Sequence, residues 1–322
     1  MSEPTVQLAQ NGEVRLGYLD WGRPAESEGE PLLMVAGLGG GRGSYPPPFI
    51  AALVEAGFHV VTYDHRDVGA STRFTDAVAA QSPFRGLIGG GAPAYTAEDM
   101  TDDAVAVMDA VGWGSAHVFG LSMGGLLAQR IALRHPDRVR SLATMSAMPS
   151  DAGGLGSLRY LHLGFIRATS RLDFPDTPEG DVETAMAVAR LCASPAYPLD
   201  EGEMRAWLEQ APVDGVRDGT AQARQLRAPW HGPKLRTLTV PTLVLHGDAD
   251  PVGRPSAARA IARQVPQARL VILPGVGHEL PRPLWPTLVG HLRDNAERAR
   301  SRRADRLTAA TDGAEPVPGC RR

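Results

Sequence analysis

Residues 117–129 read HVFGLSMGGLLAQ, and this stretch carries the strongest structural signal in the chain. It places Ser122 between Gly120 and Gly124, after an apolar run and before a run with helical spacing. Because glycine weakens both strands and helices, the two glycines predict a bend so sharp that β-carbons there would collide. The G-x-S-x-G pattern therefore predicts a strand–turn–helix unit that exposes Ser122 as a nucleophile; the alternative is an incidental turn.

A serine hydroxyl is a weak nucleophile that needs a base and hydrogen-bond donors for the oxyanion it generates. At a strand–turn–helix junction the backbone N–H of Met123 is the first expected donor, aided by the helix N-terminus. The loop AGLGGG (36–41) also follows an apolar run. Its glycines permit close approach of backbone to ligand, so we expect Gly37 to contact substrate and Leu38 N–H to be the second donor. The alternative for this loop is a flexible turn.

Two later loops offer a base and an acid in the chain order that this architecture uses. LVILPGVGHEL (270–280) predicts His278 as the general base, and LVLHGDADPV (243–252) supplies Asp248 and Asp250. We choose Asp250 as the acid because it is more distal and better placed to reach the histidine loop, whereas Asp248 suits the turn. The alternative for His278 is a surface-loop histidine. His246 ends a buried strand and is expected to be packed.

Apolar strand-like runs alternate with helix-like runs up to about residue 150 and again after about residue 237. Continuous apolar strands in such alternation predict a mostly parallel central sheet flanked by helices, an α/β fold. We assign residues 1–150 and 237–300 to this core. Residues 151–236 break the alternation and predict an inserted helical lid. The polar tail, residues 301–322, is predicted to be disordered.

Three aromatic side chains are candidates for substrate contact in this arrangement. Trp207 and Trp230 lie in the lid, where such rings line an apolar pocket or form the lid's own core. His65 lies in the loop 63–71 near the expected pocket. Asp64 and Arg66 of the same loop are interpreted as structural, holding the loop by an ion pair.

The composition excludes several classes of protein. The chain has 322 residues, 43% of them hydrophobic, and a net charge of −3, which fits one large domain with an insertion. Without clustered positive charge no nucleic-acid partner is expected. The N-terminus lacks the features of a signal peptide, no apolar run approaches the roughly 20 residues of a membrane span, and disulfide bonding is not expected. These features predict a cytoplasmic protein.

No metal or cofactor is predicted. No histidine–carboxylate cluster has zinc spacing, and neither a P-loop nor a dinucleotide fingerprint fits. The expected partner is a small-molecule ester, and both a monomer and a homodimer stay open.

The order Ser122–Asp250–His278, the AGLGG loop and YDHRDVGAS (63–71) together resemble the α/β-hydrolase fold over nearly the whole chain except the tail. In the related D-x-R-G-x-G-x-S motif, Asp67 stands where the family has glycine. This variant, with HVFGLSMGG and PGVGHEL, is similar to the aclacinomycin methylesterase group of actinobacterial polyketide tailoring enzymes and to lipase/esterase-like proteins.

The resemblance implies carboxylic-ester hydrolysis in antibiotic biosynthesis, with a small alcohol such as methanol leaving a bulky polyketide-like substrate. One departure concerns residues 36–41, which we call the oxyanion loop: relatives often have His-Gly there, and this chain has Ala36-Gly37. Because the expected donor is a backbone N–H, this change of side chain should not abolish ester hydrolysis. It concerns the geometry of the loop.

These observations predict a serine hydrolase that works through a Ser-His-Asp triad and an acyl-enzyme. Two alternatives stay open. The same fold supports acyl transfer, cyclisation or C–C bond cleavage in secondary metabolism, because fold does not determine chemistry. A non-catalytic ligand-binding protein is the second, although a receptor has no need of a matched base and acid.

Overall fold

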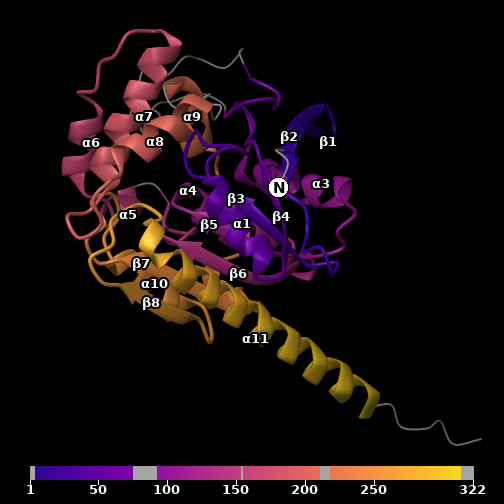
Figure 1. Ribbon diagram of the computed structural model, residues 1–322. Helices are drawn as coiled ribbons and strands as arrows, with labels where there is room; N and C mark the ends of the chain where they lie inside the picture. Colours follow the sequence, from indigo (N-terminus) through magenta and orange to yellow (C-terminus); the bar gives the residue numbers. More distant parts are fainter. Residues whose placement is uncertain (1–3, 75–92, 154, 211–217, 313–322) are drawn as a thin grey trace, which may run out of the picture.

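One eight-stranded sheet organises the computed structural model, which describes residues 4–74, 93–153, 155–210 and 218–312 (Figure 1). Its order is β1-β2-β4-β3-β5-β6-β7-β8. The strands are β1 (Gln7–Asn11), β2 (Val14–Asp20), β3 (Glu30–Val35), β4 (Phe58–Tyr63), β5 (Ala116–Leu121), β6 (Val139–Met145), β7 (Thr242–Gly247) and β8 (Arg269–Leu273). β1 and β2 form an antiparallel hairpin, β2 pairs antiparallel with β4, and all later pairings are parallel.

Helices cover both faces of this sheet and create two apolar cores. On one face pack α3 (Ala97–Ala110), α4 (Met123–Arg134) and α10 (Ser256–Gln264). On the other pack α1 (Pro47–Glu55) and the first part of α11 (Trp285–Asp312). Since both faces are covered, the central strands are apolar throughout: every residue of β7 is buried. The predicted fold class is confirmed.

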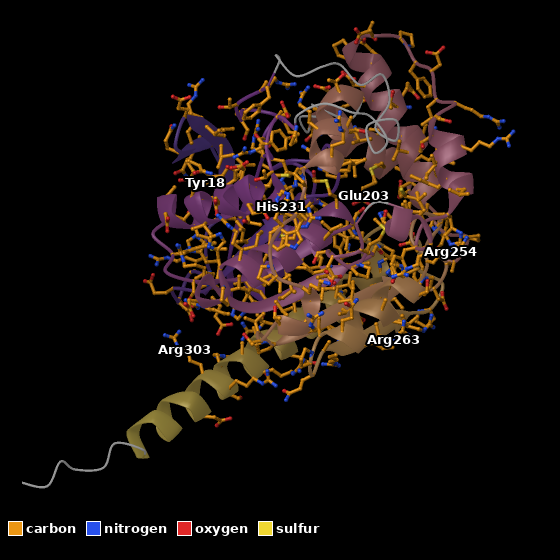
Figure 2. All side chains as sticks on the ribbon, turned by 180° about the vertical axis from the view of Figure 1, so that it is seen from behind. Tyr18, Glu203, His231, Arg254, Arg263 and Arg303 are labelled. Atoms are coloured by element: carbon orange, nitrogen blue, oxygen red, sulfur yellow. The ribbon has the colours of Figure 1, made fainter. Side chains whose placement is uncertain are left out.

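Between β6 and β7 in the sequence lie residues 151–236, which we call the insertion, and its described part is helical. The α-helices are α5 (Leu155–Leu158), α6 (Leu163–Thr169), α7 (Pro178–Cys192), α8 (Glu201–Gln210) and α9 (Gly219–Arg227). In Figure 1, α6 to α9 gather at the end of the molecule away from the free end of α11. Figure 2 shows the same division from behind, with Glu203 labelled on the insertion and Arg263 on the sheet domain. The insertion has a small core of its own, where Val182, Met186 and Leu208 meet.

The C-terminal segment differs from the sequence-based prediction. α11 continues through Asp312, so residues 301–312 are helical where disorder was predicted. The reason is local, because arginine and alanine make up half of this segment and are good helix formers despite its polarity. Residues 313–322 lie outside the described part of the chain. Within the described ranges, no helix combines the length and apolar character that crossing a membrane requires.

Candidate active site

Ser122 occupies the bend between β5 and α4. Its backbone has φ 58° and ψ −122°, a conformation that a residue with a side chain adopts only under restraint. Two hydrogen bonds supply that restraint. The Ser122 N–H donates to the Met145 carbonyl on the neighbouring strand (2.9 Å), and the Ser122 carbonyl accepts from Leu126 N–H in the helix (3.2 Å).

The flanking glycines are required by close backbone approach. A β-carbon on Gly120 would lie 2.2 Å from the Gly124 carbonyl oxygen. One on Gly124 would lie 2.1 Å from the Val35 oxygen and 2.3 Å from the Ala36 oxygen. All these neighbours are backbone atoms, which cannot move aside as a side chain does. The predicted collision at both glycines is therefore confirmed.

His278 and Asp250 meet at the carboxyl ends of β8 and β7. The His278 Nδ1 lies 2.8 Å from one carboxylate oxygen of Asp250, and the Asp250 side chain is fully buried. The other carboxylate oxygen accepts backbone N–H bonds from Val252 and Gly253, both at 2.8 Å. Burial opposes ionisation of Asp250, but the charge and hydrogen bond of His278 and the backbone donor outweigh it and lower the pKa of Asp250.

Asp248, the alternative acid, has a different contact. Its carboxylate accepts a hydrogen bond from the Gly275 N–H (2.6 Å) and thereby ties the β7 loop to the loop that carries His278. The His278 backbone N–H donates to the Cys192 carbonyl (2.9 Å) at the end of α7, so the insertion also helps to place this loop.

His246 is packed beneath the acid, as its position in a buried strand predicts. Its side chain is fully buried, and its Nε2 lies 3.0 Å from the Gly253 carbonyl and 3.5 Å from Asp250. Burial lowers the pKa of His246, so the imidazole is neutral near pH 7. A neutral imidazole here supports the Asp250 turn without competing for its charge.

The loop 36–41 lies against Ser122. A β-carbon on Gly37 would be 3.7 Å from the Ser122 β-carbon, an ordinary contact distance. Across the described ranges, no group accepts a hydrogen bond from the N–H of Leu38 or Met123, the two expected oxyanion donors. The next N–H, that of Gly39, donates to the Gln225 side chain on α9 (2.9 Å), a contact that nothing in the sequence predicts.

A cavity of about 1870 Å³ lies between the sheet domain and the insertion, and its exposed lining is mainly apolar. Both Ser122 and His278 line it. The other lining residues include Gly37, Leu38, Met123, Phe165, Trp207, Leu208 and Leu226. Concave, mainly apolar cavities with a few polar groups are typical of small-molecule sites.

Of the four residues predicted to contact substrate, Gly37 and Trp207 line this cavity, and His65 and Trp230 do not. His65 is only 1% exposed and is held beneath the loop 36–41, with Nε2 2.8 Å from the Ala36 carbonyl. Trp230 packs on the core of the sheet domain, and its indole N–H donates to Pro233 (3.2 Å). The predictions for His65 and Trp230 are therefore wrong, because internal hydrogen bonds and packing direct both rings away from the cavity.

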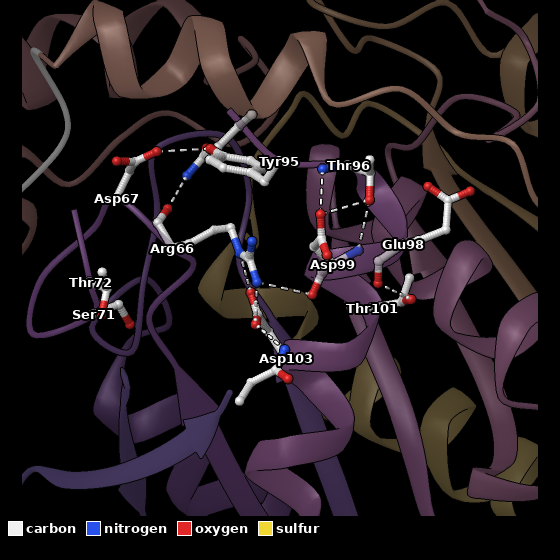
Figure 3. Close-up of polar contacts among 12 residues, drawn as sticks. Arg66, Asp67, Ser71, Thr72, Tyr95, Thr96, Glu98, Asp99, Thr101 and Asp103 are labelled. Carbon is white, nitrogen blue, oxygen red and sulfur yellow. Dashed lines mark hydrogen bonds and ion pairs between the residues drawn. The ribbon is translucent and has the colours of Figure 1, made fainter. Parts of the chain in front are cut away.

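Asp64 and Arg66 are structural, but they do not pair with each other. Asp64 forms an ion pair with Arg42. The Arg66 guanidinium forms two hydrogen bonds with Asp103 on α3, at 2.6 and 2.7 Å (Figure 3). Each partner is distant in sequence, so the loop is fastened to two other elements instead of to itself.

The described residues contain no group of three or more histidine, cysteine, aspartate or glutamate side chains arranged to hold a metal ion.

Comparisons with known proteins agree with this architecture. A family model of the α/β hydrolase fold matches residues 30–281. Rhodomycin D methylesterase DnrP of Streptomyces peucetius is 30% identical over 311 residues, which cover 89% of this chain and 98% of that protein. Rhodomycin D methylesterase DauP of Streptomyces sp. (strain C5) is 30% identical over 316 residues, 90% of this chain and 98% of that protein.

Among solved structures, an esterase RhEst1 from Rhodococcus sp. ECU1013 superposes with a TM-score of 0.67 at 19% identity, covering 91% of this chain and 98% of that one. Since this identity is low, the likeness bears on the fold alone. With the family model spanning most of the chain and the methylesterases aligning nearly end to end, the chain belongs to the α/β-hydrolase family.

Proposed function

We propose that this protein hydrolyses carboxylic esters, with Ser122 as nucleophile, His278 as general base and Asp250 as the orienting acid. One observation carries the proposal: the imidazole held by the buried Asp250 lines the same cavity as a serine set at a strained strand–helix bend. The Nδ1–H of His278 donates to Asp250, so Nε2 stays free to accept a proton.

In the proposed mechanism, Nε2 of His278 removes the Ser122 proton as the serine oxygen attacks the ester carbonyl. The carbonyl oxygen becomes an oxyanion that accepts hydrogen bonds from the backbone N–H groups of Leu38 and Met123. His278 then gives its proton to the departing alcohol, and the acyl-enzyme forms. His278 then deprotonates a water molecule that attacks the acyl-enzyme. The resulting tetrahedral intermediate collapses, the acid leaves, and His278 returns the proton to the Ser122 oxygen.

The substrate we propose is a methyl ester of a bulky, polyketide-like acid in antibiotic biosynthesis. The cavity of about 1870 Å³ exceeds the roughly 300–1,000 Å³ typical of drug-sized ligands, and its lining is mainly apolar. The methylesterases described above support this choice, because they act on a rhodomycin and align over nearly the whole chain. The insertion would act as a lid that keeps bulk water from the acyl-enzyme.

Labelling with a fluorophosphonate, followed by intact mass measurement, tests the nucleophile. We expect one adduct on the wild type, none on Ser122→Ala, and slow labelling of His278→Ala because its serine lacks a base. An adduct of equal rate on Ser122→Ala would overturn the assignment, and absence of any adduct on folded wild type would reject an activated serine.

Product analysis with bulky methyl esters tests the reaction. Release of methanol and free acid supports hydrolysis. A new ester, a lactone or a cleaved C–C bond would instead indicate acyl transfer, cyclisation or C–C cleavage, respectively. The same catalytic groups support these reactions.

A further inference from the structure

Helix α9 of the insertion joins the sheet domain through two adjacent side chains, Arg224 and Gln225. The side chain of Arg224 is 12% exposed, and Gln225 as a whole is 3% exposed. Polar side chains are buried at a cost unless their hydrogen bonds are satisfied, so such contacts between two parts of a chain are specific.

Gln225 bridges two loops of the sheet domain. Its side-chain oxygen accepts the Gly39 N–H (2.9 Å), and its side-chain nitrogen donates to the Arg66 carbonyl (3.2 Å). Gly39 follows Leu38, whose N–H is a proposed oxyanion donor. The insertion therefore contacts the oxyanion loop at the residue next to the proposed donor, Leu38.

The oxyanion loop is a tight turn whose conformation such a contact can fix. The Gly40 N–H donates to the Gly37 carbonyl (3.0 Å), which makes Leu38 and Gly39 the central residues of a β-turn. Gly39 has φ 66°, as the third residue of a type II turn requires. The central peptide of such a turn rotates between type I and type II arrangements, and a hydrogen bond on the Gly39 N–H holds one of them.

Arg224 fastens α9 in the position from which Gln225 acts. Its guanidinium pairs with both carboxylate oxygens of Asp67, each at 2.9 Å, and the Asp67 side chain is fully buried. Asp67 also accepts hydrogen bonds from the Tyr95 hydroxyl (2.9 Å; Figure 3) and the Phe74 N–H (2.7 Å). Bidentate pairs of this kind set orientation as well as contributing energy.

Asp67 has φ 71°, in the left-handed region that favours glycine. Aspartate tolerates this region better than most residues with a side chain, but less well than glycine. Aspartate at this position therefore costs some backbone strain, and in return its carboxylate has a fixed partner, Arg224, on the insertion.

We propose that Gln225 is a positioning residue that sets the oxyanion loop of the ester hydrolase from the insertion, with the Asp67–Arg224 pair holding its helix in place. The inference rests on the proposed function, since the loop matters only if Leu38 stabilises an oxyanion. Removing an oxyanion donor outright lowers kcat by about 10²–10³, and a loop that spends part of its time in the wrong turn loses less.

The test compares Gln225→Leu with the matched variant Gln129→Leu. Gln129 is also a buried glutamine that bridges backbone groups: it donates to Met148 and Gly125 and accepts from Ser150, without touching the oxyanion loop. For hydrolysis of a p-nitrophenyl ester, we expect Gln225→Leu to lower kcat about tenfold with KM within about twofold. Gln129→Leu should leave kcat within about twofold of the wild type at a temperature where both variants are folded by circular dichroism.

A second variant keeps the test decisive if Gln225→Leu does not fold. Asp67→Asn with Arg224→Met removes both charges together, and asparagine tolerates the left-handed backbone. We expect it to lower kcat about threefold, again with little change in KM, because Gln225 is retained on a less fixed helix.

Failure of the inference and failure of the proposed function give different results. A wild type that takes up fluorophosphonate, with kcat unchanged in Gln225→Leu or equally reduced in Gln129→Leu, would overturn the inference alone. A wild type that takes up none would overturn both. A rise in KM without loss of kcat would also reject positioning, because it would make Gln225 part of substrate binding.

Discussion

Replacing Asp250 by asparagine tests the assignment of the acid most sharply. In the structure one carboxylate oxygen accepts two backbone N–H groups and the other accepts the His278 Nδ1–H. Asparagine has one oxygen. If that oxygen keeps the two backbone bonds, the amide NH₂ faces Nδ1, which must then be the unprotonated nitrogen.

The consequence for His278 is the wrong tautomer. Its proton would be on Nε2, the atom that has to accept the proton of Ser122. In serine proteases the same change lowers kcat by about 10⁴, which corresponds to about 5.5 kcal/mol of transition-state stabilisation. The two backbone bonds remain in place here, so we expect a loss of similar size with the protein still folded.

The assay is kcat/KM on a p-nitrophenyl ester together with the rate of fluorophosphonate labelling. Asp248→Asn is the matched control, since its carboxylate accepts the Gly275 N–H in the same pair of loops, and it should stay within about threefold of the wild type. An Asp250→Asn variant that retains more than a tenth of wild-type activity, or a comparable loss in Asp248→Asn, would refute the reasoning.

Gly124→Ala should abolish folding or activity because the new β-carbon would meet two backbone oxygens. Gly290→Ala on α11 has open space around the new carbon and should raise the free energy of unfolding by about 0.5–1 kcal/mol. Urea denaturation measures the stability of both variants. Because the pKa of Asp250 is lowered in the folded state, its ionised form stabilises the fold at pH values above its unfolded pKa of about 3.9. This stabilisation is lost as the pH falls through the lower pKa of the folded state. Asp250→Asn should therefore flatten the acid side of a plot of the free energy of unfolding against pH. Arg66→Met leaves the buried carboxylate of Asp103 without its main partner and should cost about 3–5 kcal/mol, partly recovered when Asp103 is also changed to leucine.

The parts of this protein that the sequence predicts are those encoded locally. The bend at Ser122 follows from two glycines four residues apart, and the parallel sheet follows from apolar runs separated by helical spacing. Chain order and position after a strand predict His278 and Asp250 as base and acid, and the structure brings them within hydrogen-bond distance. Parallel strands carry their carboxyl ends to one edge, so position after a strand is already spatial information.

The predictions that failed depend on contacts between distant parts of the chain. Arg66 pairs with Asp103, 37 residues away, although Asp64 is much nearer in sequence. His65 lies in the expected loop but turns its imidazole under the Ala36 carbonyl. A loop sequence indicates which side chains are available, and only the packed structure decides which of them faces a cavity.

Gln225 gave no signal in the sequence for the same reason, since 186 residues separate it from Gly39. The oxyanion loop is held from two sides: His65 bonds the Ala36 carbonyl from within the sheet domain, and Gln225 bonds the Gly39 N–H from the insertion. Helix α9 also contributes Leu226 to the cavity wall. If Gln225 positions the loop, one helix carries both substrate contact and support for the oxyanion turn. A bulky acyl group packed against Leu226 would then stabilise the arrangement in which Leu38 is aligned, so that binding energy from a remote part of the substrate appears in kcat as well as in KM.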